Sequence, residues 1–77
     1  MTQLNLSAGL AGSQEILVGT EHTAAHVGSG TVAVLATPVM INLIEAAALA
    51  AIEHLLPEGY QSLGTVLNIR HIAATPV

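Results

Sequence analysis

An apolar run in the middle of the chain predicts one long helix over residues 38–55. The run is rich in Ala, Leu, Met and Glu, which favour helix. Thr37 and Pro38 are typical of a helix start, with Thr as the N-cap and Pro at the first helical position. Pro57 and Gly59 are typical of a helix end.

This predicted helix is apolar on nearly every side. Its few polar side chains form one narrow stripe, within about 80° of one another on a helical wheel: Asn42, Glu45 and Glu53. A helix with so little polar surface is enclosed by other structure rather than lying on a protein surface. Near its end, Glu53 and His54 are expected to be exposed.

The segments around the helix are expected to be strands and loops. Residues 61–74 alternate as a strand does, and the more apolar face, which also carries His71, is expected to meet the helix. Residues 13–18 predict a second, shorter strand. Residues 19–36 contain several glycines and are expected to form a loop, and residues 1–12 a loose arm. Two strands cannot cover a helix that is apolar all round, so the domain is expected to be incomplete by itself.

Composition excludes several classes of function. Of the 77 residues, 52% are hydrophobic and 8% are charged, which is too apolar for a disordered chain. So few charges cannot coat a self-contained soluble domain, which indicates that further chain or a partner subunit covers much of the surface. One Arg, no Lys and a net charge of −4 argue against nucleic-acid binding.

The sequence also indicates a cellular compartment. The absence of cysteine removes disulfides and fits a reducing cytoplasm, and the first residues do not have the pattern of a secretory signal. Residues 39–56 have about the length of a membrane span. However, they carry Glu45 and Glu53, and each acid at mid-bilayer costs roughly 2.5–3.5 kcal/mol. A cytoplasmic protein outside the membrane is therefore expected.

Several separated motifs keep a mutual spacing that is more specific than any one of them. They are His26-Val27-Gly28-Ser29-Gly30, Val34-Leu35-Ala36-Thr37-Pro38, Ile44-Glu45-Ala46-Ala47, Ser62-Leu63-Gly64-Thr65 and Arg70-His71-Ile72-Ala73-Ala74-Thr75-Pro76. Over roughly residues 14–77 the chain resembles a family of hotdog-fold acyl-CoA thioesterases that includes the fluoroacetyl-CoA thioesterase.

The resemblance implies an α+β hotdog fold, in which an antiparallel sheet wraps a long central helix and two subunits pair. Residues 1–77 would then be a single incomplete hotdog domain. They would hold the first strand, the central helix and the second strand, while the last three strands have no counterpart. The resemblance also implies a catalytic set: Thr37 at the helix start, Glu45 two turns further on and His71 on the following strand.

These residue types suit thioester hydrolysis. Free N–H groups at a helix start attract the negative charge that develops on the carbonyl oxygen. A carboxylate on a buried helix serves as base or nucleophile, and histidine transfers protons near neutral pH. Two routes stay open: Glu45 and His71 activate a water, or they activate Thr37 as the nucleophile. By resemblance, Gly64 and Pro38 bind substrate, and no cofactor or metal takes part.

Each of these residues also has a simpler interpretation. Thr37 alone is most simply a helix cap, Glu45 a solvated member of the stripe, and His71 a hydrogen-bonded buried histidine. His22 and His26 have the four-residue spacing of a helical metal pair, but no third ligand accompanies them. Only the joint spacing of Thr37, Glu45 and His71 favours catalysis.

The sequence therefore predicts a cytoplasmic acyl-CoA thioesterase that assembles as a dimer or larger homo-oligomer and releases free acid and CoA. Another hotdog activity, such as a dehydratase, is an alternative, and so is a non-catalytic acyl-binding or assembly subunit. The acyl substrate does not follow from the sequence. With no Phe or Trp and a single Tyr, Tyr60, the chain offers little for an aromatic acyl lid.

Overall fold

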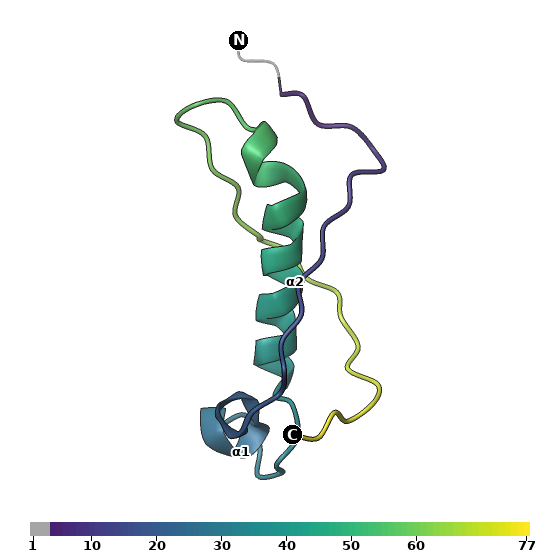
Figure 1. Cartoon of the computed structure of the whole chain (residues 1–77), viewed down its shortest axis with the longest axis vertical. Helices are drawn as coiled ribbons and strands as arrows, with labels where there is room; N and C mark the ends of the chain where they lie inside the picture. Colours follow the sequence, from purple (N-terminus) through teal and green to yellow (C-terminus); the bar gives the residue numbers. More distant parts are fainter. Residues whose placement is uncertain (1–3) are drawn as a thin grey trace.

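One long helix organises the molecule, which we describe from a computed structural model over residues 4–77 (Figure 1). In chain order the elements are the 3₁₀ turn η1 (Thr20–His22), the short helix α1 (Ala24–Val27), the long helix α2 (Thr37–Ile52) and the 3₁₀ turn η2 (Glu53–Leu55). Together, α2 and η2 occupy the span over which the sequence predicts the long helix.

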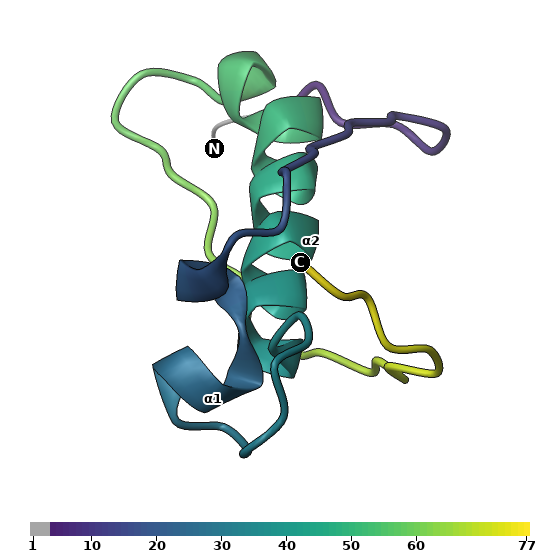
Figure 2. The same ribbon diagram turned by 60° about the horizontal axis from the view of Figure 1, so that its bottom comes forward.

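Two extended segments run alongside α2, one before it in the chain and one after it. Figures 1 and 2 show the segment before η1 running along the helix, and the segment after η2 reversing direction and returning to the helix start. Over residues 4–77 the chain forms no strand, only two isolated antiparallel bridges. The molecule is therefore a helix with extended flanks, and the α+β hotdog prediction is only loosely consistent with it.

The strands predicted over residues 13–18 and 61–74 are wrong for this structure. Both segments are extended, but no β-bridge joins them to each other within residues 4–77. A strand exists only where a neighbour accepts its N–H and C=O groups, and alternation in the sequence does not supply that neighbour. As a result, apolar side chains that a sheet would cover stay open to solvent, including Leu17 at 93% and Ile72 at 88% exposure.

The loop predicted over residues 19–36 contains short helical elements. At the start of α1, the Thr23 hydroxyl accepts a hydrogen bond from the His26 N–H at 3.3 Å. At its end, Gly28 adopts a left-handed conformation with φ of 87°, which glycine tolerates best. The sequence prediction missed this helix because it is a single turn between two glycines.

Three chain segments meet just before α2, and we call this meeting point the basal junction (residues 22–24, 34–36 and 75–76). Bridges join Thr23 to Leu35 and Val34 to Pro76. The Leu35 N–H donates to the Thr75 carbonyl at 2.7 Å, and the Ala36 N–H donates to the His22 carbonyl at 2.8 Å. Thr23 and Ala36, at 2% and 0% exposure, are the buried residues of the described chain. The best-packed part of the molecule thus lies at the N-terminal end of α2.

The N-terminal arm predicted over residues 1–12 lies partly outside the described residues, which begin at residue 4. Its last residue is not loose. A Cβ atom added to Gly12 would lie 2.8 Å from the Ala51 nitrogen and would overlap the Ala47 carbonyl oxygen. Gly12 therefore lets the extended segment pass directly over the backbone of α2.

Apart from the basal junction, the molecule is open. Its accessible surface is 5988 Å², whereas a compact monomer of its mass exposes about 4,400 Å². Its radius of gyration is 15.4 Å, against about 11.5 Å expected for a compact domain of this length. No residue of α2 is fully buried. The prediction that other structure must enclose this helix is not met by the described chain alone.

Within the described residues, one helical stretch, Thr37–Leu55, is long and apolar enough to cross a membrane by length and composition, with a mean hydropathy of 1.4. The core helix of a soluble protein meets the same criteria.

Candidate active site

Thr37, the first predicted catalytic residue, lies inside α2 rather than at its N-cap position. Ala36, with φ of −70° and ψ of 137°, is the N-cap, so Thr37 is the first helical residue and Pro38 follows it. No side chain caps this helix. The prediction that Thr37 is the N-cap is therefore wrong, and its hydroxyl is free for another partner.

That partner is His71. Thr37 Oγ1 and His71 Nδ1 are 2.8 Å apart and hydrogen-bonded, although the residues are 34 positions apart in the chain. The tautomer of the ring decides which of the two atoms donates. Thr37 is exposed and His71 is half-buried. The basal junction explains the contact, because it holds Thr75 and Pro76 against the residues that precede α2.

A hollow of about 350 Å³ surrounds this pair. The residues that line it come from α1, the segment before α2 and the chain near His71: Ala24, Ser29, Gly30, Thr31, Val32, Val34, Leu35, Thr37, His71, Ile72, Ala73 and Ala74. The hydrogen-bonded pair is therefore accessible to a small molecule from one side.

Fewer N–H donors are free at the start of α2 than at an ordinary helix start. Pro38 has no N–H, and the Val39 N–H donates to the Ala36 carbonyl at 3.0 Å. The Thr37 N–H finds no acceptor within residues 4–77. One backbone donor, next to the Thr37 hydroxyl, is thus available to an oxyanion.

Glu45 lies further along the helix and contacts Gly64. A Cβ added to Gly64 would be 3.3 Å from Glu45 Oε2, so the carboxylate lies directly over the glycine backbone. Glu45 is half-buried. Both residues line a second hollow of about 280 Å³, whose other walls are mainly aliphatic: Ile44, Ala48, Leu49, Ile52, Ser62, Leu63, Val66 and Leu67. Glu45 is therefore partly covered by the returning segment.

The structure brings the predicted site residues together as two pairs, not as one cluster. Thr37 and His71 line the first hollow, while Glu45 and Gly64 line the second. Thr37 and Glu45 are eight residues apart, which is about 12 Å along a helix axis. Pro38 is exposed and lines neither hollow. A single copy of the described chain thus does not gather the whole predicted set at one point.

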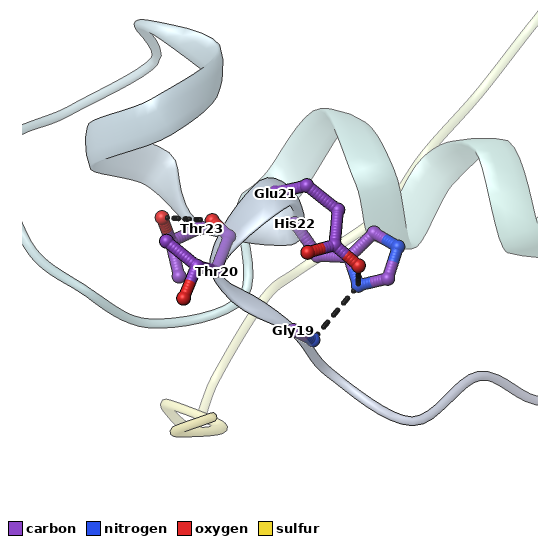
Figure 3. A network of polar contacts seen from close by, with 5 residues as sticks. All are labelled: Gly19, Thr20, Glu21, His22 and Thr23. Carbon is purple, nitrogen blue, oxygen red and sulfur yellow. Dashed lines mark hydrogen bonds and ion pairs between the residues drawn. The ribbon is translucent and has the colours of Figure 1, made fainter.

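His22 and His26 do not lie on one helix, as the four-residue spacing of a helical metal pair requires. They lie in different elements, η1 and α1, and the residues that the structure describes contain no group of three possible metal ligands. Figure 3 shows what His22 does instead: its Nδ1 accepts a hydrogen bond from the Gly19 N–H at 2.9 Å, with Glu21 Oε1 at 3.6 Å. This network shapes the turn that leads into the basal junction.

Glu53 has a role that the sequence did not predict. Expected to be exposed, this residue is half-buried and accepts two hydrogen bonds from Ser62. The sequence places Glu53 on the same polar stripe as Glu45, but the contact with Ser62 follows only from the path of the returning segment.

Comparison with known proteins identifies the family. Searches of curated proteins and of solved structures give no match. The family described as fluoroacetyl-CoA-specific thioesterase (FlK) matches over residues 18–77, which is more than half of the chain. The matched range includes both residue pairs described above, and the family indicates thioesterase activity. The chain therefore belongs to the fluoroacetyl-CoA-specific thioesterase family.

Proposed function

We propose that this protein hydrolyses an acyl-CoA thioester to the free acid and CoA. The observation that carries the proposal is the hydrogen bond between Thr37 Oγ1 and His71 Nδ1. Its 2.8 Å length lies within the range of nucleophile and base pairs, about 2.6–3.2 Å. Family membership supports the reaction class. The proposal concerns the thioester class, because fluoroacetyl-CoA is the substrate in the name of the family.

In the proposed reaction, Thr37 Oγ1 attacks the acyl carbonyl carbon while His71 Nδ1 accepts the hydroxyl proton. The Thr37 N–H donates to the oxyanion that forms. The C–S bond then breaks, and the sulfur leaves as CoA thiol with the proton from His71. Glu45 then takes a proton from a water whose oxygen adds to the acyl-threonine ester. The ester bond to Thr37 Oγ1 breaks, the acid is released, and the proton returns from Glu45 to restore the hydroxyl.

The second route uses no covalent intermediate, because Glu45 and His71 direct water at the thioester itself. Rapid acid quench followed by intact-mass measurement separates the two routes. A transient mass increase equal to the acyl group supports Thr37 as nucleophile. Steady turnover without any such species contradicts that role and leaves water as the attacking group.

We further propose that the working form is a homo-oligomer, a dimer or larger. Two observations support it. The chain exposes about 1,600 Å² more surface than a compact monomer of its mass, which is about twice the area of roughly 800 Å² that one partner buries in a standard protein interface. In addition, Glu45 lies in a different hollow from Thr37 and His71. Pairing two copies would supply a Glu45 carboxylate to the Thr37–His71 pair of the other copy.

Mixing two inactive variants tests the shared site. Thr37→Val and Glu45→Gln chains, each inactive alone, are unfolded together and refolded as a mixture. If the sites are shared across a two-fold dimer, about a quarter of wild-type turnover returns, because half of the dimers hold one intact site. No recovery, with mixed dimers verified by mass, would place all three residues in one copy.

The hydrolysis itself is tested by free-thiol release from a series of acyl-CoA substrates. Substitution of Thr37, Glu45 or His71 is expected to lower the rate of thiol release, while the variant protein remains folded. Near-wild-type turnover in both Glu45→Ala and His71→Ala would exclude the proposed site.

A non-catalytic acyl-binding subunit is the second candidate, and the separation of Glu45 from the Thr37–His71 pair favours it. Such a subunit would retain the intact thioester. Equilibrium binding of an acyl-CoA without thiol release, in an oligomer verified as folded, would select this candidate over the enzyme.

A further inference from the structure

A carboxylate near the end of the long helix holds the segment that returns along it. Glu53 Oε2 accepts the Ser62 hydroxyl at 2.5 Å and the Ser62 N–H at 3.3 Å. Both residues are half-buried. Two donors from one residue on a single carboxylate oxygen fix both the backbone and the side chain of Ser62. We call this arrangement the Glu53–Ser62 clamp.

Between the two residues of the clamp the chain turns back sharply. The Tyr60 N–H donates to the Pro57 carbonyl at 3.0 Å, and Gly59 has φ of 85°, as the third position of a type II turn requires. Residues 58–61 are exposed. The turn reverses the chain but does not hold the returning segment against α2, whereas the clamp does.

The clamp lies next to the Glu45–Gly64 contact. Ser62 and Gly64 are two residues apart, which is at most about 7 Å of extended chain. The next hydrogen-bonded residue of the returning segment is His71, seven residues after Gly64, and seven extended residues span about 23 Å. Over those residues the segment bows away from the helix (Figure 1). The position of Gly64 is therefore set from the Ser62 side.

We propose that Glu53 is a positioning residue: through Ser62 it holds Gly64 against the carboxylate of Glu45 and so orients that carboxylate for the proposed hydrolysis. This inference rests on the proposed function for its catalytic consequence, but the positioning itself is measurable without turnover. Glu53 acts through Ser62 and Gly64 and touches no substrate.

The positioning is tested first by NMR on the complete chain. Glu45→Gln is expected to shift the Gly64 amide resonance, because the carboxylate lies over that glycine. In the Glu53→Ala background the same substitution should shift it by less than half as much. An equal shift in both backgrounds would overturn the proposal, whether or not the protein is an enzyme.

The catalytic consequence is tested by the separate responses of kcat and KM. Misplacing a reacting group by about an ångström costs up to a hundredfold in rate, so Glu53→Ala and Ser62→Ala should each lower kcat about tenfold. KM should change less than twofold. Glu53→Gln keeps an acceptor oxygen and should recover most of the lost rate.

Glu58→Gln is the matched control, since Glu58 is exposed in the same connection and the substitution removes the same charge. Its kcat should equal that of wild type. A loss of rate in Glu58→Gln as large as that in Glu53→Ala would mean that charge in this connection, not position, matters, and would overturn the inference. If wild type itself shows no thiol release, the proposed function fails, while the NMR comparison still decides the positioning.

Discussion

The two ends of α2 are built in different ways. At its start, two bridges and several backbone hydrogen bonds gather three chain segments around buried Thr23 and Ala36, and the Thr37–His71 pair lies on that base. Further along, no backbone pairing is present within the described residues, and two carboxylates of the helix hold the returning segment, at Glu45–Gly64 and at the clamp.

This difference has a consequence for function. Backbone pairing anchors the chain directly before Thr37 and again four residues after His71, whereas the Glu45 side of the helix is open and lined by exposed aliphatic residues. A reaction centre needs a rigid part and a part that closes over substrate. The start of α2 supplies the rigid part, and we infer that a second copy of the chain completes the part that closes over substrate.

The largest expected effect comes from breaking the hydrogen-bonded pair at the rigid end. His71→Ala removes the proton acceptor of Thr37, and general-base groups contribute about 10²–10⁴-fold to rate. Thiol-release kinetics should therefore show kcat lowered at least a hundredfold. Thr37→Val, which keeps the side-chain shape, should have a loss of similar size. Retained turnover in either variant would mean that the rigid end is structural only.

A smaller effect is expected where the N-terminal segment crosses the open half of α2. Gly12→Ala places a methyl group into the Ala47 carbonyl and within 2.8 Å of the Ala51 nitrogen. Overpacking of this kind costs about 1–3 kcal/mol, so the midpoint of chemical denaturation should fall. Gly9→Ala is a useful comparison, because nothing lies within 4 Å of the added Cβ, although its φ of 95° brings backbone strain alone.

An unchanged midpoint in Gly12→Ala would show that residues before η1 leave the helix in solution. The open half of α2 would then have even less cover than the structure shows.

The sequence predicted what depends on local chemistry and missed what depends on distant neighbours. The long helix was predicted because residues between Pro38 and Pro57 are mainly apolar helix formers, with no proline or glycine among them. The residues of both site pairs were named because the family motifs contain them. The strands over residues 13–18 and 61–74 were not formed, since alternation shows that a segment suits a sheet but not that a partner strand is present.

The two errors of detail have the same origin. Thr at a helix start is normally a cap, but the Thr37 hydroxyl is bonded to His71, 34 positions away, and Ala36 takes the cap position instead. Glu53 was expected to be exposed because it is near a helix end. Only the path of the returning chain shows that Ser62 reaches it.

A modest loss of stability is expected from the basal junction. Thr23→Val keeps the shape of a side chain that is 2% exposed, but it removes the hydroxyl that donates to the Thr20 carbonyl at 2.8 Å and caps α1. Loss of such a cap costs about 0.5–2 kcal/mol. Thermal unfolding should show the decrease, and hydrogen exchange should become faster at the Leu35 and Ala36 amides. A stable variant with unchanged exchange would mean that backbone pairing alone holds the junction.

The smallest effect is expected from Glu21→Gln, two positions before Thr23. The Glu21 carboxylate is 3.6 Å from His22 Nδ1, but its side chain is 65% exposed, and Nδ1 already accepts the Gly19 N–H at 2.9 Å. Exposed pairs of this kind contribute about 0–1 kcal/mol, so the midpoint of unfolding should change by less than in Thr23→Val, and less again at high salt. A larger loss than in Thr23→Val would mean that the charged turn, rather than the buried threonine, holds the rigid end of α2 together.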